Sequence, residues 1–472
     1  MARATANSRG RSLFLSVFAA IALIPWAGCA TLAPRAREAQ AAELLTDLEA
    51  RTAAALPDER PLALHDCIGI ALEHNLAIRA AAIDAALARL DVNVAFADFL
   101  PRVAASANLT AWSEQPSSNI GGFIQAPMHD RTLRQYSVDA QLPVFVPATW
   151  FAYAMRRQGA AAGLLAEELA RQAVVLDVTS RYFEALTREA EAEALHSQVA
   201  AARAFASEIG AMHAEGLVLD WERDGALANV RALETRLLER QGLAGLARAA
   251  LLEAMGLDPA APVTLASAPA PDSVLAPVEE LMYRALLAHP ALHLADRQAA
   301  MAEARVKQAI AAFLPAVSAF ASLSGTSNST SLPGRTLYGG VGGVLSLFDG
   351  FANVQEYRMA RMRSEKAYVE REAQSLAILL RVLGSHLNVQ LARAWHEVAA
   401  DALAVEEARL EAVRARAAEG LVLPSEQLGA LADRDAARLD VTRTLYRRLL
   451  SEAMLRHATG APWTPEPGGD GA

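Results

Sequence analysis

Cysteine and clustered positive charge are both scarce in this sequence of 472 residues. The only two cysteines, Cys29 and Cys67, form no CxxC spacing and provide no disulfide framework. The net charge is −9, and no block of lysine and arginine interrupts it. Nucleic acid is therefore not expected as a partner, because binding to phosphates requires a basic patch.

Motifs for catalysis or for metal binding are also missing. The sequence has no GxSxG, no P-loop and no GxGxxG. His396 and Glu397 begin an HExxH pattern, but Ala400 occupies the place of the second zinc ligand. The other histidines are scattered, and a single histidine is more often an ordinary surface or core residue than a ligand. The sequence predicts a protein that is not an enzyme and needs no cofactor or metal.

Long apolar runs are limited to the N-terminus. Residues 13–27 are apolar and follow three arginines, but the run is shorter than the roughly 20 residues of a membrane-spanning helix. Ala27 and Gly28 precede Cys29 as in a bacterial lipobox, which predicts that Cys29 becomes the lipidated first residue. Trp26 departs from the leucine that a lipobox prefers, and the alternative is an ordinary cleaved signal peptide. Any later crossing of a membrane is expected to use strands.

Alanine and other strong helix formers are abundant, and aromatic residues make up only 6% of the chain. This composition is typical of long, closely packed helices. Residues 64–109 match residues 278–323 without a gap, at an offset of 214 (278 minus 64). The triplet Phe-Leu-Pro at 99–101 thereby falls on the same triplet at 313–315. The chain is therefore expected to contain two copies of one unit.

A second match supports this interpretation. Residues 214–219 are identical to residues 418–423, at an offset of 204 (418 minus 214). The change of offset requires a shorter loop in the second copy, and residues 324–336 are indeed fewer than residues 113–135. Two matched blocks in the same order, joined by a consistent deletion, are difficult to explain by chance.

Each copy is expected to begin with a helix, at 65–97 and at 278–311. Pro101 and Pro315 end these helices, because proline lacks the amide donor and clashes with the preceding turn. The apolar period then changes from 3.6 to 2, which predicts strands. They cover, in chain order, residues 102–111, 136–142, 317–324 and 337–346.

These strands alternate between apolar and polar or small residues, as the strands of a membrane β-barrel do. The alternative is a soluble hairpin with one face on a core. Four strands cannot close a barrel, since even small membrane barrels need about eight. If the strands meet lipid, several chains must therefore share one barrel, because an open strand edge leaves backbone groups unpaired.

Long helices without proline are expected at about 150–213 and 351–419, with return helices at 221–256 and 425–459. Such lengths require a coiled coil or a barrel of helices, and four leucines keep the spacing of a packing seam: Leu376, Leu380, Leu383 and Leu387. Gly216 and Gly420 are placed to close the long helices in the left-handed conformation. Asp220 and Ser425 are predicted to cap the return helices.

These features divide the chain into six segments. A signal peptide is expected at 1–28, a lipidated N-terminal segment at 29–63, and the first copy at 64–256. A linker rich in proline and alanine follows at 257–277, then the second copy at 278–460 and a disordered tail at 461–472.

The order of these elements resembles the TolC-like family of outer membrane efflux proteins. The resemblance rests on the two Phe-Leu-Pro triplets, the two Gly-Leu-Val-Leu turns, and the strand-to-helix passages at 142–145 and 345–350. The first copy departs from the family at Val146 and Pro147, where Asp-Gly is common. An Asn-Pro pair that is frequent in the family's first helix is also split between the copies, as Asn75-Leu76 and His289-Pro290.

The resemblance implies a mostly α-helical fold with a small β-barrel part. A homotrimer would form a twelve-stranded barrel in outer-membrane lipid and a long tunnel of helices through the periplasm. It would be the passive outlet of a tripartite efflux pump for small molecules, with a periplasmic adaptor (membrane fusion) protein and an inner-membrane transporter as partners. The alternatives are the outer-membrane component of a type I protein secretion system, or a structural coiled-coil lipoprotein of the envelope.

The resemblance also implies where the functional residues lie. The periplasmic tips would contact the adaptor through Gly216, Leu217, Val218, Leu219, Asp220, Gly420, Leu421, Val422, Leu423, Pro424 and Ser425. Acidic side chains near the tips would form a ring of negative charge if they face the lumen, and the candidates are Glu208, Glu407 and Glu411. The alternative is that these carboxylates lie on a solvated helix face.

Overall fold

A computed structural model describes residues 37–56, 60–120, 124–268, 274–329, 331 and 334–461. The chain divides into two units, residues 1–59 and residues 60–472. The first unit contains helix α2 (Arg37–Ala55). The predicted signal peptide, the predicted lipidation site at Cys29 and residues 462–472 of the predicted tail lie outside the described residues.

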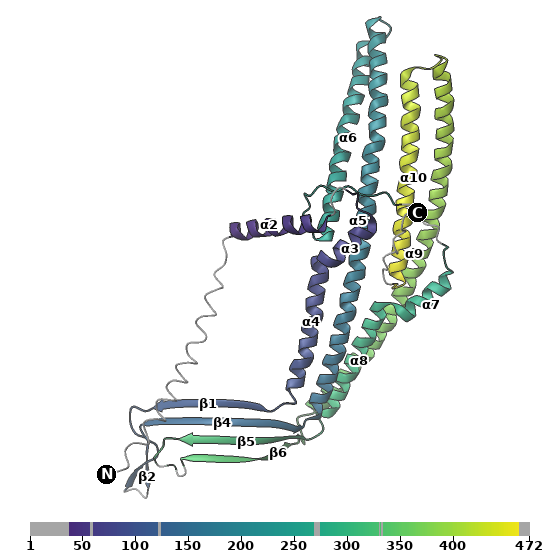
Figure 1. The fold of residues 1–472 in the computed structure, drawn as a ribbon. Coiled ribbons are helices and arrows are strands. Elements are labelled where there is room, and N and C mark those ends of the chain that lie inside the picture. The colour runs from purple at the N-terminus through teal and green to yellow at the C-terminus, as the bar shows by residue number, and fades with distance from the viewer. Residues whose placement is uncertain are drawn as a thin grey trace. The chain divides into compact units, whose positions relative to one another are not determined.

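The second unit contains the same order of elements twice (Figure 1). We call residues 64–255 the first half and residues 278–458 the second half. The first half consists of α3 (Leu64–His74), α4 (Leu76–Ala97), β1 (Arg102–Ala111), β4 (Thr132–Phe145), α5 (Pro147–Ala214) and α6 (Asp220–Met255). The second half consists of α7 (Val278–Ala288), α8 (Pro290–Ala311), β5 (Ala316–Thr326), β6 (Arg335–Val344), α9 (Ala352–Ala418) and α10 (Pro424–Ala458).

The first helix of each half is interrupted, so the prediction of single helices at 65–97 and 278–311 is wrong. Asn75 ends α3 and begins α4, because its side chain accepts hydrogen bonds from the Ala77 and Ile78 amides at 2.8 and 3.2 Å. His289 caps α8 in the same way before Pro290, because its Nδ1 accepts a hydrogen bond from the Ala291 amide at 3.1 Å. A side chain that satisfies the free amides of a helix N-terminus stabilises a new start at that position.

The helices end before the two prolines, as predicted. Helix α4 ends at Ala97 and α8 ends at Ala311, and a short turn leads from each to Pro101 or Pro315. The long helices also form where expected, with 68 residues in α5 and 67 in α9. At 1.5 Å per residue each is about 100 Å long.

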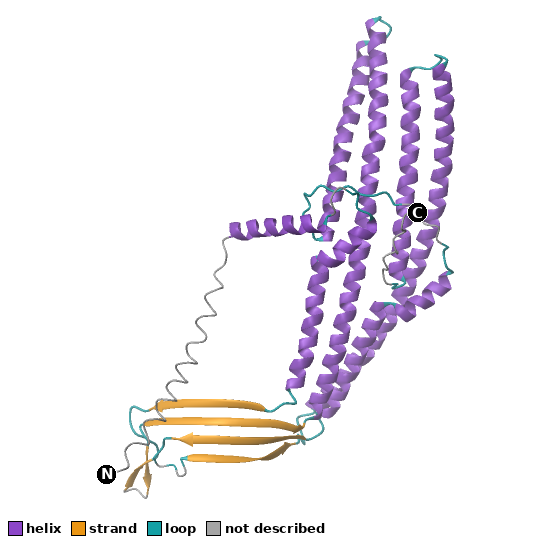
Figure 2. Ribbon diagram, in the orientation of Figure 1, coloured by secondary structure: helices purple, strands orange, loops and turns teal. Residues whose placement is uncertain are grey.

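The four long strands form one antiparallel sheet in the order β1-β4-β5-β6. Figure 2 shows this sheet at the end of the helices that lies far from the turns at Gly216 and Gly420. The central pairing, β4 with β5, joins the two halves. A second, two-stranded sheet of β2 (Ser117–Ile120) and β3 (Ile124–Pro127) lies in the loop of the first half, and the sequence analysis did not predict it.

The helices pack as two long hairpins, α5 with α6 and α9 with α10. Helix α5 also packs against α4, α8 and α10, so it has neighbours from both halves. Helix α9 packs mainly against α10, α8 and α7, which all belong to its own half. The core of the second half is centred on Ile378, Val382 and Val389 of α9, which are fully buried against α7, α8 and α10. The two long helices therefore differ in how much of their surface the chain itself covers.

Candidate functional site: the surfaces of a channel

The sheet has one apolar face, set by the strand register. Val103 pairs with Ala140, Ala140 with Ala321, and Ala321 with Gly339. The next row on the same face contains Val138, Leu323 and Leu337, whose side chains are exposed. No part of the described chain covers this face with a core, as a soluble hairpin would require.

The opposite face of the sheet is polar. One row consists of Ser106, Ser137, Ser324 and Thr336. The neighbouring row contains Asp139, whose Oδ1 and Oδ2 each accept a hydrogen bond of 2.6 Å, from Ser322 and Ser137 respectively. One polar and one apolar face are typical of a sheet that lies between water and an apolar medium.

A row of apolar side chains runs along α9, and we call it the α9 stripe. It consists of Leu376, Leu380, Leu383, Leu387, Leu391, Val398 and Val405. Steps of three, four and seven residues keep these side chains on one side of a helix. Leu380 is 72% exposed, and the other six are also exposed in the described chain. The stripe therefore has the spacing of a packing seam, and no helix among the described residues covers it.

The α9 stripe explains a second property of α9. Among the described residues, α9 is the one helix long and apolar enough to cross a membrane by length and composition, with a mean hydropathy of 1.3 over 18 residues. Only 22% of that stretch is buried within the chain. A helix that covers its apolar row against a neighbouring helix has the same composition without any membrane.

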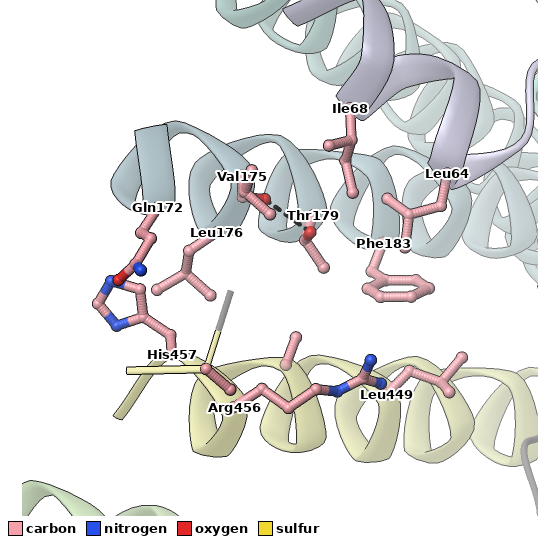
Figure 3. A pocket seen from close by; sticks show the side chains of 12 residues that line it. Leu64, Ile68, Gln172, Val175, Leu176, Thr179, Phe183, Leu449, Arg456 and His457 are labelled. Carbon is pink, nitrogen blue, oxygen red and sulfur yellow. Dashed lines mark hydrogen bonds between the residues drawn. The ribbon is translucent and has the colours of Figure 1, made fainter. Parts of the chain in front are cut away.

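The equivalent surface of α5 is covered by α10 (Figure 3). At the offset of 204, Leu376, Leu380, Leu383 and Leu387 correspond to Gln172, Leu176, Thr179 and Phe183. These four side chains face Leu449, Ala453 and His457 of α10 across a cavity of about 170 Å3. The ring of Phe183 stacks on Tyr446 of α10, with centroids 5.6 Å apart.

The turns at the other end of the helices have the geometry that the glycines predict. Gly216 has a φ of +75° and Gly420 a φ of +72°. The Leu217 amide donates to the Met212 carbonyl at 2.9 Å, and the Leu421 amide donates to the Arg416 carbonyl at 3.0 Å. This pattern closes a helix with a left-handed residue, for which glycine has no steric cost. The prediction for both glycines is confirmed.

The predicted caps at the start of the return helices are wrong. Leu219 and Leu423 occupy the cap positions, so Asp220 and Ser425 already lie inside the helices. Glu222 accepts a hydrogen bond from the Leu219 amide at 2.8 Å instead. Asp220 lies 2.7 Å from Nε2 of His213, across the turn. A glutamate three residues after the cap satisfies the amide of the cap residue itself, as in one half of a capping box.

The tips expose large apolar side chains. Leu217, Leu219, Leu421 and Leu423 are exposed, whereas Val218 and Val422 are half-buried. Trp221, which the sequence analysis did not single out, is 69% exposed beside the first turn. Exposed tryptophan and leucine on a tip are typical of a surface that another protein covers.

Comparison with known proteins identifies what these surfaces belong to. The family model described as "Outer membrane efflux protein" matches residues 67–257 and again residues 281–461. The chain belongs to the outer membrane efflux protein family. The family consists of channels and not of enzymes, as the sequence analysis predicted. It also places the chain in the outer membrane, with an extension into the periplasm.

Individual relatives agree with the family. The curated relative "Protein CyaE" of Bordetella pertussis is 28% identical over 415 residues, which are 84% of either chain. The CmeC outer membrane channel of Campylobacter jejuni has a TM-score of 0.69 and 17% identity, over 84% of this chain and 85% of its own. The outer membrane protein VceC of Vibrio cholerae has a TM-score of 0.67 and 19% identity, over 84% and 96%. The two structures show that the mostly helical fold with a small strand part is that of these outer-membrane proteins.

The three acidic residues proposed for a ring in this efflux-family channel have different surroundings. Glu407 and Glu411 are exposed on α9, one turn apart. Glu208 is half-buried on α5, and its Oε1 accepts a hydrogen bond of 2.6 Å from the Ser425 amide at the start of α10. Glu208 therefore connects the two tips of one chain. The structure does not bring it together with Glu407 and Glu411.

Two further residues named in the sequence, His396 and Cys67, make ordinary contacts within the fold. Among the described residues, no group of His, Cys, Asp and Glu side chains is arranged to hold a metal ion. Nδ1 of His396 lies 3.2 Å from the hydroxyl oxygen of Thr444. Cys67 is fully buried in α3, and this burial raises the pKa of its thiol to about 12. It packs as a small apolar residue.

Proposed function

We propose that three copies of this chain form the outer-membrane channel of a tripartite efflux pump. The channel is a passive duct for small molecules across the outer membrane and the periplasm. The observation that carries the proposal is the four-stranded sheet, which has an apolar face and, at β1 and β6, two edges without a partner strand among the described residues.

The strands have the dimensions of a membrane barrel. They contain 10, 14, 11 and 10 residues in the order β1, β4, β5 and β6, and a tilted strand needs about 9–11 residues to cross a bilayer. Backbone groups on an open edge find no water in lipid, so β1 and β6 must pair with other chains. Three chains of four strands give twelve strands, an even number within the range of outer-membrane barrels.

The helices support the same assembly through the contact of α5 with α10. Within one chain, α5 of the first half packs against α10 of the second half. If first and second halves alternate around a ring, α9 packs in the same way against α6 of the next chain. The α9 stripe then packs on the face of α6 that corresponds to the α10 wall of the cavity. This arrangement accounts for an apolar row that is exposed on α9 and covered on α5.

The surface of α6 fits such a neighbour. At the offset of 204, Tyr446 and Leu449 of α10 correspond to Gly242 and Gly245 of α6. A Cβ atom built on either glycine would meet no other atom of the described chain within 4 Å. Small residues on one helix leave room for the large side chains of another, and the leucines of the α9 stripe are such side chains.

The adaptor and the lipid anchor complete the proposal. We place the adaptor at the two tips, on the exposed leucines that flank Gly216 and Gly420 and on Trp221. The inner-membrane transporter acts through that adaptor and selects the cargo. Lipidation of Cys29 tethers the N-terminal segment to the outer membrane. A lipid anchor on an outlet favours small-molecule efflux over protein secretion as the pathway.

Cross-linking tests the trimer and its contact together. The chain with Leu387→Cys and Gly242→Cys is purified from membranes and treated with a short bis-maleimide. The expected result is a ladder on denaturing gels that ends at three linked chains, because this pair corresponds to Phe183 and Tyr446 in one chain. The single variants are the control. A purified protein that stays monomeric without a cross-linker, or a double variant that links no further than its controls, would contradict the assembly.

Loss of the gene tests the cargo. A deletion strain is expected to become sensitive to small toxic compounds, and the wild-type gene is expected to restore growth. Secreted proteins from the medium are compared in the same strains. A deletion that leaves every tested compound tolerated, but removes one protein from the medium, would contradict small-molecule efflux and support the type I secretion alternative.

A further inference from the structure

The polar face of the sheet contains one carboxylate, and the efflux function does not account for it. Asp139 lies in the middle of β4, in a row with Ala104 of β1, Ser322 of β5 and Tyr338 of β6. Among the residues of the four long strands it is the only acidic one. A single carboxylate in this sheet raises the question of what it interacts with.

Two serines fix the carboxylate of Asp139 in place. Ser322 Oγ donates to Oδ1 and Ser137 Oγ donates to Oδ2, each at 2.6 Å. Ser106 Oγ lies 3.0 Å from Ser137 Oγ and extends this network to β1. The side chain of Asp139 is therefore held by serines of β4 and β5, and the network reaches β1 through Ser106.

No positive charge neutralises Asp139. In the described residues it forms no ion pair, and the only other charged strand residue on the polar face is Arg102. Arg102 is already paired with the carboxylate of Asp98, which lies just before β1. Arg134 and Arg335 belong to the apolar face by register. Each chain thus contributes one uncompensated negative charge to the polar face.

We infer that Asp139 sets the ion preference of the barrel, through a ring of three symmetry-related carboxylates that favours cations. The inference rests on the proposed function, because the polar face lines the lumen only if the apolar face meets lipid. Rings of acidic side chains make pores select cations. Lipid around the barrel strengthens the effect, since walls of low dielectric constant focus the field into the water-filled lumen.

The second half does not repeat this charge. At an offset of 203, the strand-to-helix passage at 142–145 corresponds to 345–348, and Asp139 corresponds to Gly342 of β6. Gly342 lies on the polar face, in register with Ser318. The ring therefore has three charges and not six. A Cβ atom at Gly342 would come no closer than 4.0 Å to any neighbour, which is the ring of Phe320, so the site accepts a larger side chain.

Conductance in planar lipid bilayers tests the inference with the full chain. In a gradient of KCl, the reversal potential of the wild-type channel is expected to show a preference for K+ over Cl−. Asp139→Asn keeps the shape of the side chain and is expected to lower the permeability ratio severalfold. Asp139→Glu keeps the charge and is expected to retain most of it. High salt is expected to weaken the preference, because it screens the ring.

Gly342→Asp provides a gain of function on the same face. It adds a second carboxylate for each chain and is expected to raise the preference for K+, whereas Gly342→Asn controls for the added volume. Glu407→Gln combined with Glu411→Gln tests whether the tips set the preference instead.

The failures of the two proposals are distinguishable. A protein that forms no conducting channel in the bilayer contradicts the proposed function itself. A channel that conducts, but keeps its permeability ratio in Asp139→Asn, overturns the inference about Asp139. The same conclusion follows if the ratio changes only with Glu407 and Glu411. Trimers on unheated gels show that each variant is assembled before its conductance is compared.

Discussion

The two long helices of this channel have nearly the same length but meet different surroundings. On α5, the face that contains Leu176 and Phe183 lies under α10 of the same chain. On α9, the equivalent Leu380 and Leu387 have no such cover and remain exposed. The composition of the faces differs accordingly: the first contains Gln172 and Thr179, whereas the α9 stripe is entirely aliphatic.

In the proposed trimer, the difference separates a contact within one chain from a contact between chains. The face of α5 is buried as soon as one chain folds, and a fixed neighbour accommodates a buried glutamine or threonine. In the proposed trimer, the α9 stripe finds its neighbour on another chain. Association depends mainly on the apolar area removed from water, so leucine is the residue type expected there. Four variants break or sharpen this comparison, and we take them from the largest expected effect to the smallest.

The largest effect is expected from charges in the α9 stripe. Leu380→Glu with Leu387→Glu is expected to abolish the trimer, since each of the three contacts would bury two unpaired carboxylates. Unheated denaturing gels and size-exclusion chromatography measure the assembly. Asn388→Asp, exposed on another side of α9, is the control and is expected to assemble normally. A double variant that still forms trimers would show that the stripe is not a contact.

A smaller effect on assembly is expected at Gly242 of α6. Gly242→Leu overfills the proposed contact, which costs about 1–3 kcal/mol in a packed site. The single chain is not crowded there, and leucine is the better helix former by about 1 kcal/mol. The fraction of trimer is therefore expected to fall while the isolated chain unfolds at the same or a higher temperature, as circular dichroism would measure. Loss of helix in the isolated chain would instead indicate a folding defect.

A local effect is expected at the tips, which also differ between the halves. The start of α6 is held by its own Glu222, whereas the start of α10 depends on Glu208 from the first half. Glu208→Ala removes a hydrogen bond to a charged group, which is worth about 1.5–3 kcal/mol. Amide exchange at residues 423–427 is expected to become about tenfold or more faster, with no change at residues 217–224. Glu407→Ala is the control, and equal rates in the two variants would contradict the contact.

The smallest effect concerns the breaks that begin α4 and α8. Burial, and to a smaller extent the positive charge of Arg381, lowers the pKa of His289 from 6.5 to about 4. The unfolded chain therefore takes up a proton first, so the stability that neutral His289 contributes is complete above pH 6.5 and is lost as the pH falls toward 4. The free energy of unfolding by urea, measured across this range, is expected to depend less on pH in His289→Asn.

Asparagine is the matched replacement in this experiment, because Asn75 holds the same position in the first half and has no titratable group. His457 also has a lowered pKa through burial, so part of the pH dependence is expected to remain. If the free energy of unfolding of His289→Asn depends on pH as it does in the wild type, His289 does not titrate on unfolding.

Much of the fold could be predicted from the sequence, because it depends on local signals. Period-two segments gave the four long strands, and Pro101 and Pro315 marked the ends of the preceding helices. Gly216 and Gly420 marked the turns, since a glycine directly after a long helical pattern commonly adopts the positive φ that ends a helix. The α9 stripe was also visible as a seam of leucines, although its exposure was not.

The features that escaped prediction depend on contacts between distant segments. Glu208 reads as a lumen candidate until α10 is seen to place the Ser425 amide against it. Asp139 is one polar residue in an alternating strand, and only the register with β5 reveals that Ser322 holds it. The break at Asn75 was missed because an asparagine within a helical pattern gives no sign that its side chain caps a new helix.

The contact between α5 and α10 has a consequence for how assembly ends. In the proposed assembly, the α9 stripe of one chain meets the α6 face of the next, so the copies join head to tail. Such heterologous contacts give either a closed ring or an endless filament, depending on the rotation between neighbours. Here the chain already contains one example of that rotation, between its own two halves. In the proposed trimer, the rotation between the two halves of each chain thus sets the curvature of the ring, so growth stops when the first and last subunits touch.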